Sequence, residues 1–201
     1  MQFWKTFLFI FNYFVPGNHL IIVGGYGNGV LSSVEVLDEN KHLSCNISSY
    51  PISVHGHSST VTASGILVCG GWRKDCYEYR SNSWTMMPPM TTKRSYFGMI
   101  HLKNKIYAVG GYDGSRSTNS MDIFDSSTRT WTKQSIPFDV YHHCITELSA
   151  NQLILLGGNT VANGQSGKVN KMLWQKIFKS KISLFYIALH KIFLQTLFSK
   201  F

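Results

Sequence analysis

The chain has 201 residues and a formal net charge of +9, from 19 Lys/Arg against 10 Asp/Glu; 14% of its residues are aromatic, with 17 glycines but only 5 prolines. This composition excludes a disordered polar chain and leaves enough length to bury a core. After Glu147 the sequence contains seven lysines and no acidic residue, so 12 Lys/Arg remain against all 10 acids before that point. Because the basic excess lies in the C-terminal part, the body lacks the charge pattern of a nucleic-acid-binding protein, and we expect no nucleic-acid partner.

The first 17 residues differ in character from the rest of the chain. Lys5 precedes the apolar run 6–15, which ends at Pro16 and Gly17. This order is typical of a secretory signal peptide, and the alternative is a buried strand belonging to a longer chain. The triplet Asn46-Ile47-Ser48 fits a glycosylation acceptor in the same compartment. We therefore favour secretion over a cytoplasmic location and treat residues 1–17 as a signal-like or irregular segment.

A Gly-Gly pair closes an apolar run at four places, residues 24–25, 70–71, 110–111 and 157–158. The run before the third pair, Ile106-Tyr107-Ala108-Val109, is representative. The pairs succeed one another at steps of 46, 40 and 47 residues. A period in the forties with strand-like segments is typical of the blades of a β-propeller.

The residues around each Gly-Gly pair predict further strands. Short turns separate each of the last three apolar runs from a segment before it, which is the spacing of a hairpin. These segments are residues 58–63, 98–102 and 144–148. Segments 34–38, 76–79 and 121–125 come after the Gly-Gly pairs and alternate in character, as half-buried strands do. Turn residues then lead to Trp84 and Trp131. The alternation predicts an all-β fold and argues against helices in this region.

These residues resemble the kelch repeat. The best copy runs from Trp84 through Pro88-Pro89-Met90, Arg94 and Gly98 to the Gly-Gly pair at 110–111. The resemblance covers residues 17–158, with valine at positions 54 and 140 in place of the arginine and with no tryptophan in the first repeat. It implies blades of four antiparallel strands: three strands of a first blade, two full blades and two strands of a fourth, about thirteen strands in all.

Three to four blades are fewer than a kelch ring usually has, because propellers close with typically about 4–8 blades and kelch rings usually with about six. We therefore expect a partial propeller: a truncated chain or an open arc, with kelch repeats at residues 18–167. Residues 168–201 form a basic, apolar tail outside the repeats, where the absence of glycine and proline from residue 173 onward allows a helix. Membrane contact by this tail is an alternative that we do not favour.

Four cysteines occur without a CxxC pair or zinc-ligand spacing. On the kelch pattern, Cys69 ends one strand and Cys76 opens its antiparallel neighbour, so a Cys69–Cys76 disulfide is the favoured pairing. A secreted kelch protein of the galactose-oxidase type resembles this arrangement. The alternative is that all four cysteines are reduced and mostly buried.

Histidines cluster at His55-Gly56-His57 and at His142-His143. The kelch-type copper enzyme galactose oxidase pairs a tyrosine with a histidine, as Tyr141 and His142 suggest. We prefer a structural interpretation, since His57 and His143 occupy the repeat position that Phe97 fills. The sequence has no phosphate loop, nucleophile elbow or zinc-protease motif, so we expect no enzyme, no metal and no cofactor.

The kelch pattern places the loops between second and third strands on the same face as the connections between blades. We expect these loops to form a binding surface because Trp, Tyr and Arg anchor interfaces. The candidate binding residues are Trp72, Arg73, Arg94, Tyr112, Asp113 and Arg116. The predicted function is a protein-interaction module that binds another protein through these loops. The alternative is a secreted, galactose-oxidase-like kelch protein that is catalytic only when complete.

Overall fold

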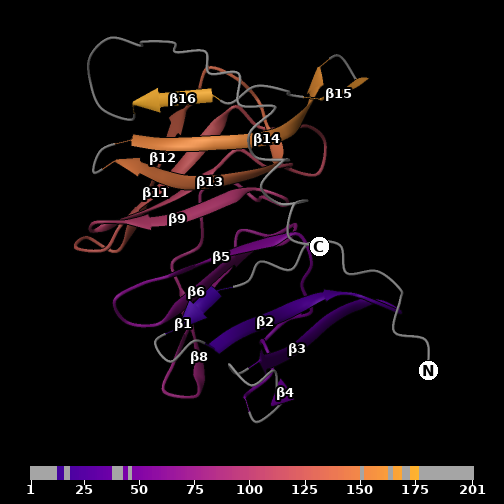
Figure 1. Ribbon diagram of the computed structural model, residues 1–201, viewed down its shortest axis with the longest axis vertical. Helices are drawn as coiled ribbons and strands as arrows, with labels where there is room; N and C mark the ends of the chain where they lie inside the picture. Colours follow the sequence, from indigo (N-terminus) through magenta and orange to yellow (C-terminus); the bar gives the residue numbers. More distant parts are fainter. Residues whose placement is uncertain are drawn as a thin grey trace, which may run out of the picture.

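The computed structural model describes residues 13–15, 19–37, 43–44, 47–149, 152–162, 165–168 and 173–176. Within these ranges the fold is all-β, with four antiparallel sheets and no helix, which confirms the predicted fold class. No helix there is long and apolar enough to cross a membrane. The sheets are arranged in chain order, from indigo to orange (Figure 1).

Each sheet contains four consecutive strands, and we call the sheets blades 1 to 4. Blade 1 contains β1 (Tyr13–Val15), β2 (His19–Tyr26), β3 (Val30–Leu37) and β4 (Leu43–Ser44). Blade 2 contains β5 (His57–Val61), β6 (Ile66–Gly70), β7 (Cys76–Arg80) and β8 (Ser83–Met87). Blade 3 contains β9 (Gly98–Leu102), β10 (Lys105–Val109), β11 (Ser120–Asp125) and β12 (Thr130–Ser135). Blade 4 contains β13 (Tyr141–Ser149), β14 (Gln152–Ala162), β15 (Gln165–Lys168) and β16 (Leu173–Lys176).

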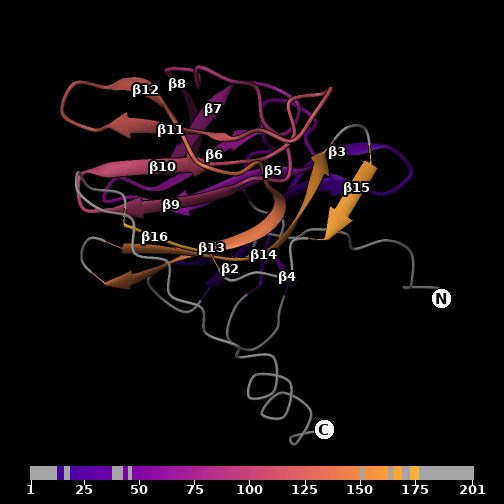
Figure 2. The ribbon, with the colours of Figure 1, turned by 90° about the horizontal axis from the view of Figure 1, so that it is seen from above.

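The first strands of neighbouring blades lie next to each other. Strand β5 contacts β9 and also β1, and β9 contacts β13. The blades are therefore arranged around their first strands, as in a propeller, and the later strands of blades 2 and 3 extend outward (Figure 2). Consecutive blades face each other, so their inner strands must bury both faces.

The strands before the Gly-Gly pairs show this two-sided burial. In β6, Ile66 and Val68 pack in the cluster shared with blade 1, whereas Leu67 packs toward blade 3. In β10, Ile106 packs toward blade 2, whereas Tyr107 packs in the cluster shared with blade 4. Successive side chains of a strand point to opposite faces, so one apolar run supplies two interfaces. This explains why the runs before the glycines are continuously apolar.

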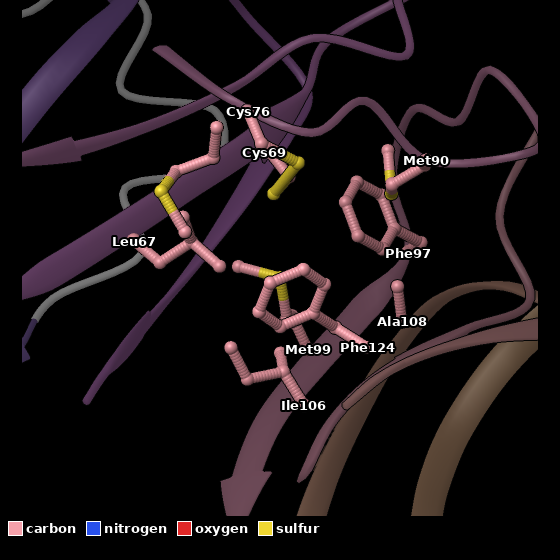
Figure 3. Close-up of a cluster of buried hydrophobic side chains, with 10 residues drawn as sticks. Leu67, Cys69, Cys76, Met90, Phe97, Met99, Ile106, Ala108 and Phe124 are labelled. Carbon is pink, nitrogen blue, oxygen red and sulfur yellow. A yellow bond between two sulfur atoms is a disulfide. The ribbon is translucent and has the colours of Figure 1, made fainter. Parts of the chain in front are cut away.

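The interface between blades 2 and 3 is built from both blades. Leu67 and Met90 come from blade 2 and the linker after it, and Phe124 comes from blade 3. Figure 3 shows Met90 beside the Phe97 ring, with Phe124 next to Met99. Trp131 of β12 packs at the edge of this cluster, and its Nε1–H donates to the Pro88 carbonyl oxygen at 2.8 Å. The Trp-containing strand thus links its blade to the preceding one.

The first glycine of a pair allows the next blade to approach. The backbone of Gly110 is left-handed (φ 62°), and a Cβ atom there would lie 2.4 Å from the carbonyl oxygen of Val140, in the linker to blade 4. That oxygen accepts a hydrogen bond from Gly111 N–H at 2.7 Å. Gly24 and Gly70 have the same relation to the linkers after their blades. The repeated glycines therefore serve blade-to-blade contact as well as the turn.

The outer strands differ from the prediction of about thirteen strands. Blade 4 has four strands where the sequence predicts two, because β14 pairs with β15 through residues 159–162 and with β16 through residues 152–155. Strand β16 falls within the tail, and these four residues are extended rather than helical. In the N-terminal segment, Tyr13–Val15 pairs with β2. Neither β15 nor β16 carries the aromatic–acidic pattern by which the other outer strands were predicted.

Candidate functional site

One face of the structure is formed by the loops between second and third strands and by the linkers between blades. We call it the loop face; it comprises residues 27–29, 47–56, 71–75, 88–97, 110–119 and 136–140 together with the strand ends that adjoin them. Backbone contacts join these segments across blades. Arg73 bridges to Arg94, and Ser95 bridges to Tyr112. The loops are thus held to one another and not only to their own blades.

Seven rings form a continuous chain of contacts on this face, and we call them the ring cluster. Its members come from all four blades and their linkers: Tyr26, His55, Trp72, Tyr96, Tyr112, Tyr141 and His142. Centroids of contacting rings lie between 4.4 and 6.4 Å apart. Most pairs meet edge to face or tilted, the geometries that aromatic quadrupoles favour.

Trp72 is the centre of the ring cluster. Its indole contacts Tyr96 at 5.9 Å and Tyr112 at 5.7 Å, centroid to centroid, both edge to face. Its Nε1–H donates a hydrogen bond to Nε2 of His55 at 3.1 Å. The side chain is still 39% exposed. Trp72 is therefore held in place and presents its ring to solvent.

The backbone at three ring-bearing positions is left-handed. The φ angles of Trp72, Tyr96 and His142 are 71°, 54° and 55°, which are uncommon for residues with large side chains. Tyr96 and His142 occupy the position that glycine fills at residue 56, next to the start of the first strand of the blade. The Tyr96 N–H donates to the Gly56 carbonyl oxygen, and the His142 N–H donates to the Tyr96 carbonyl oxygen. Such outliers persist where the surrounding structure fixes them, and they cluster at functional sites.

Exposed apolar side chains gather at the blade 1 and blade 2 end of this face. Tyr26, Val30, Leu31 and Trp72 are four of the six large hydrophobic side chains that are exposed in the described part of the chain. Tyr26 and Val30 are cross-strand partners at the tip of the β2–β3 hairpin, and the Tyr26 ring contacts His55 at 5.7 Å. A contiguous exposed apolar patch marks an interaction site more often than scattered residues do.

Of the residues predicted from the sequence, Trp72 and Tyr112 belong to the ring cluster, and Arg73, Asp113 and Arg116 lie beside it. The side chain of Arg73 is 57% exposed, and its guanidinium lies 4.0 Å from Asp75. Asp113 accepts hydrogen bonds from the N–H groups of Ser115 and Arg116, which order the loop. Partial burial raises the pKa of Asp113, but these hydrogen bonds outweigh it and hold the pKa below its usual value.

Arg94 is a correction to the predicted binding set, because its side chain is completely buried. Its guanidinium lies 3.2 Å from the Asp122 carboxylate and donates to the Ser120 carbonyl oxygen at 2.8 Å. Asp122 in turn accepts from the Thr92 N–H at 3.0 Å. Arg94 therefore ties the linker before blade 3 to strand β11. It supports the surface and does not form part of it.

A pocket of about 280 Å³ opens between the β10–β11 loop and the linker before β13. Its lining consists of Arg116, Ser117, Asn119, Pro137, Phe138 and Asp139. The hydroxyl groups of Ser117 and Thr160 both donate to the carboxylate of Asp139, one of the lining residues, and so hold it in place. It is large enough for one side chain of a bound partner.

Cys69 and Cys76 are directly opposed in the β6–β7 pair, with Cα atoms 4.1 Å apart and their sulfur atoms joined as a disulfide. Both side chains are buried, and the yellow bond between their sulfur atoms is visible in Figure 3. The loop between the two cysteines carries Trp72 and Arg73. Cys144 is a free, exposed cysteine. The predicted glycosylation acceptor Asn46 lies outside the described residues, as do the signal-like residues 1–12.

The paired histidines divide between core and surface. His57 and His143 are buried, and burial lowers the pKa of each to about 4, so both are neutral near pH 7. His55 and His142 belong to the ring cluster instead. No group of three or more His, Cys, Asp or Glu side chains in the described ranges is arranged to hold a metal ion.

Sequence reasoning missed His55 and Tyr96 as surface residues. A usable signal exists, because both lie two residues before the start of a first strand, next to positions occupied by Gly56 and Phe97. The left-handed backbone recurs at Gly56, Tyr96 and His142, each directly before His57, Phe97 or His143. Large side chains are uncommon in this conformation, so Tyr96 and His142 stand out at the position that glycine fills in the other repeat.

Comparison with known protein families agrees with this architecture. The kelch motif matches residues 93–136, which run from the linker before β9 to the end of blade 3. Residues 93–136 are thus a kelch motif, and the chain resembles kelch-repeat proteins. Its four sheets are blades of a partial kelch propeller, and the Gly-Gly contacts described above are the physical basis of the repeat.

Similar proteins share these repeats. The chain is 33% identical over 104 residues to Kelch-like protein 8 from Mus musculus, covering 45% of this chain and 16% of that protein. It is 34% identical over 116 residues to Kelch-like protein 36 from Rattus norvegicus, covering 53% and 19%. A putative F-box/kelch-repeat protein from Arabidopsis thaliana is 41% identical over 58 residues, covering 29% and 20%. These three matches thus span a fifth or less of each relative's length, and the relatives give the galactose-oxidase alternative no support.

Proposed function

We propose that this chain is a non-enzymatic kelch interaction module that binds another protein through the ring cluster on its loop face. The observation that carries the proposal is the concentration of exposed apolar side chains there. Tyr26 and Trp72 are 53% and 39% exposed, although both make ring contacts that fix their positions. Solvated aromatic rings held in place are the usual anchors of protein interfaces.

Preorganisation supports this role. The Trp72 indole is fixed by one hydrogen bond and by ring contacts from Tyr96 and Tyr112. A side chain that is already ordered loses little rotamer freedom when a partner binds, a cost that is otherwise about 0.5–1.5 kcal/mol per side chain. For the same buried area, the ring cluster should therefore lose less conformational entropy on binding, and bind more tightly, than flexible loops would.

The charges around the ring cluster favour a protein over a nucleic acid. Exposed Arg73 and Arg116 each lie beside an aspartate, Asp75 and Asp113 respectively, at 4.0 Å. Paired charges of both signs form a polar rim of the kind that surrounds the apolar centre of a protein interface. A nucleic-acid site would require an unbalanced basic stripe. Membrane contact through the tail stays an alternative that we do not favour.

A comparative purification tests the proposal. The 201-residue chain is used as bait beside a Tyr26→Ala/Trp72→Ala variant, and Met86→Ala serves as the matched control because Met86 is 58% exposed on the outer strand β8. We expect a protein that is retained by the wild type and by the control, lost with the double variant, and bound directly when purified. A direct partner that binds all three chains equally would contradict the proposal. Melting temperatures of the three chains show whether each is folded.

A further inference from the structure

The hydrogen bond between Trp72 and His55 constrains the protonation of the histidine. An indole Nε1–H can only donate, so Nε2 of His55 must accept and cannot carry a proton itself. The neutral imidazole satisfies this when its proton is on Nδ1. A protonated imidazole carries N–H groups at both positions and has no acceptor left.

Three rings from different elements surround the His55 imidazole. They are Tyr26 of β2, Trp72 of the β6–β7 loop and Tyr96 of the linker before β9, with centroids 5.7, 6.1 and 6.4 Å from it. The titratable groups in ring contact with His55 are thus Tyr26 and Tyr96, and buried His57 lies two residues further on, at the start of β5. None of the ion pairs formed by the described residues involves His55. Among the described residues, therefore, no ion pair stabilises a charged His55 imidazole.

We propose that His55 is a pH-sensitive acceptor that fixes Trp72 at neutral pH and releases it when the imidazole is protonated. The proton comes from solvent and binds Nε2, so that two N–H groups oppose each other and the Trp72 hydrogen bond is lost. The freed indole must then be ordered again by any partner that uses it. This last step rests on the proposed function, whereas the release of Trp72 does not.

The size of the effect is set by the bond that is lost. A hydrogen bond of this kind changes an equilibrium constant by a factor of about threefold to tenfold. We therefore expect the affinity for a partner to decrease by this factor when His55 becomes protonated. Histidine side chains in general change their charge between about pH 5 and pH 8, a range that includes the pH of acidified compartments. A partner would accordingly bind more weakly at acidic pH than at neutral pH.

The indole N–H signal of Trp72 tests the release directly. Nitrogen-15 NMR spectra of the tryptophan side chains of the 201-residue chain are recorded from about pH 8 to about pH 5.5, the range in which imidazole titrates. Trp72→Phe assigns the resonance. We expect the Trp72 signal to shift with one titration in the wild type and in His101→Gln, a control on β9 outside the ring cluster. In His55→Gln it should stay constant, because the amide oxygen accepts the N–H and does not titrate.

A constant Trp72 signal in the wild type, or a signal that still titrates in His55→Gln, would overturn the proposal. Circular dichroism at both ends of the range verifies that each variant stays folded. The affinity of a purified partner is then measured at both pH values. Absence of any binding at neutral pH would contradict the proposed function and leave the indole titration to decide the release. If the Trp72 signal titrates but the partner binds with equal affinity at both pH values, the release of Trp72 would stand. Only its effect on partner affinity would be refuted.

Discussion

Two glycines at the same repeat position offer a matched test of blade-to-blade contact. Gly110 and Gly157 have nearly the same backbone, with φ 62° and 69°. A Cβ atom on Gly110 would lie 2.4 Å from the Val140 carbonyl oxygen and 3.0 Å from Cε1 of His143. A Cβ atom on Gly157 meets no described atom within 4 Å. Alanine at the two positions therefore differs in steric contact and not in backbone strain.

The expected costs can be derived from these contacts. Both alanines must adopt a left-handed backbone, which costs about 1–2 kcal/mol. Gly110→Ala must also displace the Val140 carbonyl, which costs about 1–3 kcal/mol for overpacking. The same shift weakens the Gly111 hydrogen bond, worth about 1 kcal/mol. We expect Gly110→Ala to destabilise the chain by about 2–4 kcal/mol more than Gly157→Ala does.

Urea unfolding monitored by circular dichroism measures the difference, with the melting temperature as a second measure where unfolding is irreversible. Gly70→Ala repeats the test at the preceding blade, since its Cβ would lie 2.6 Å from the Arg94 carbonyl oxygen. Equal destabilisation at Gly110 and Gly157 would refute the reasoning. It would mean that the glycines are required only for their backbone conformation.

Three further predictions concern the interior. Arg94→Ala should lower the free energy of unfolding in urea by about 3–5 kcal/mol, because it leaves the Asp122 carboxylate buried without its cation. A loss no larger than that caused by a substitution of an exposed residue would contradict the buried ion pair. Trp131→Ala should lower the free energy of unfolding by about 3 kcal/mol, since it removes the ring contacts and the hydrogen bond of a half-buried side chain. An unchanged melting temperature would contradict the role of Trp131 in the interface between blades 2 and 3. The pKa of His57 and of His143 is lowered to about 4 by burial, so the unfolded chain takes up protons first as the pH falls. The free energy of unfolding should therefore be highest above about pH 6.5 and decrease toward pH 4, by about 3 kcal/mol per histidine at most. A free energy of unfolding that does not change with pH over this range would contradict the prediction.

The sequence predicts the repeated elements of the fold because their signals are local. Each Gly-Gly pair, with the apolar run before it, identifies a central strand such as β6 or β10. The two-sided burial of those strands explains why their residues are apolar throughout and do not alternate. By contrast, β15 and β16 carry no such signal, since they are defined by pairing with β14 and not by their own composition.

The binding surface is only partly predictable for a related reason. Trp72 and Tyr112 lie in loops whose position is determined by the strand order, so the sequence assigns them to one face. Arg94 lies in the same set of loops, but the direction of its side chain depends on Asp122, which is 28 residues away along the chain. Tyr96 joins the ring cluster through a left-handed backbone, which residue type alone does not indicate.

The ring cluster also connects the fold to the disulfide. Cys69 and Cys76 close the base of the loop that carries Trp72, and both sulfur atoms are buried in the interface between blades 2 and 3. Whether the chain is secreted, as the sequence favours, stays a prediction. The Cys69–Cys76 disulfide connects the loop that carries Trp72 to the interface between blades 2 and 3. Loss of the disulfide should therefore alter the position of Trp72.

Hydrogen–deuterium exchange of the chain with and without its bound partner tests the central claim most directly. If the loop face is the interaction surface, binding should slow exchange in residues 71–75 and 110–119, whose loops carry Trp72 and Tyr112. The outer strands β8 and β12 should exchange at the same rate in both states. Protection confined to those outer strands, with the loops unchanged, would contradict the account.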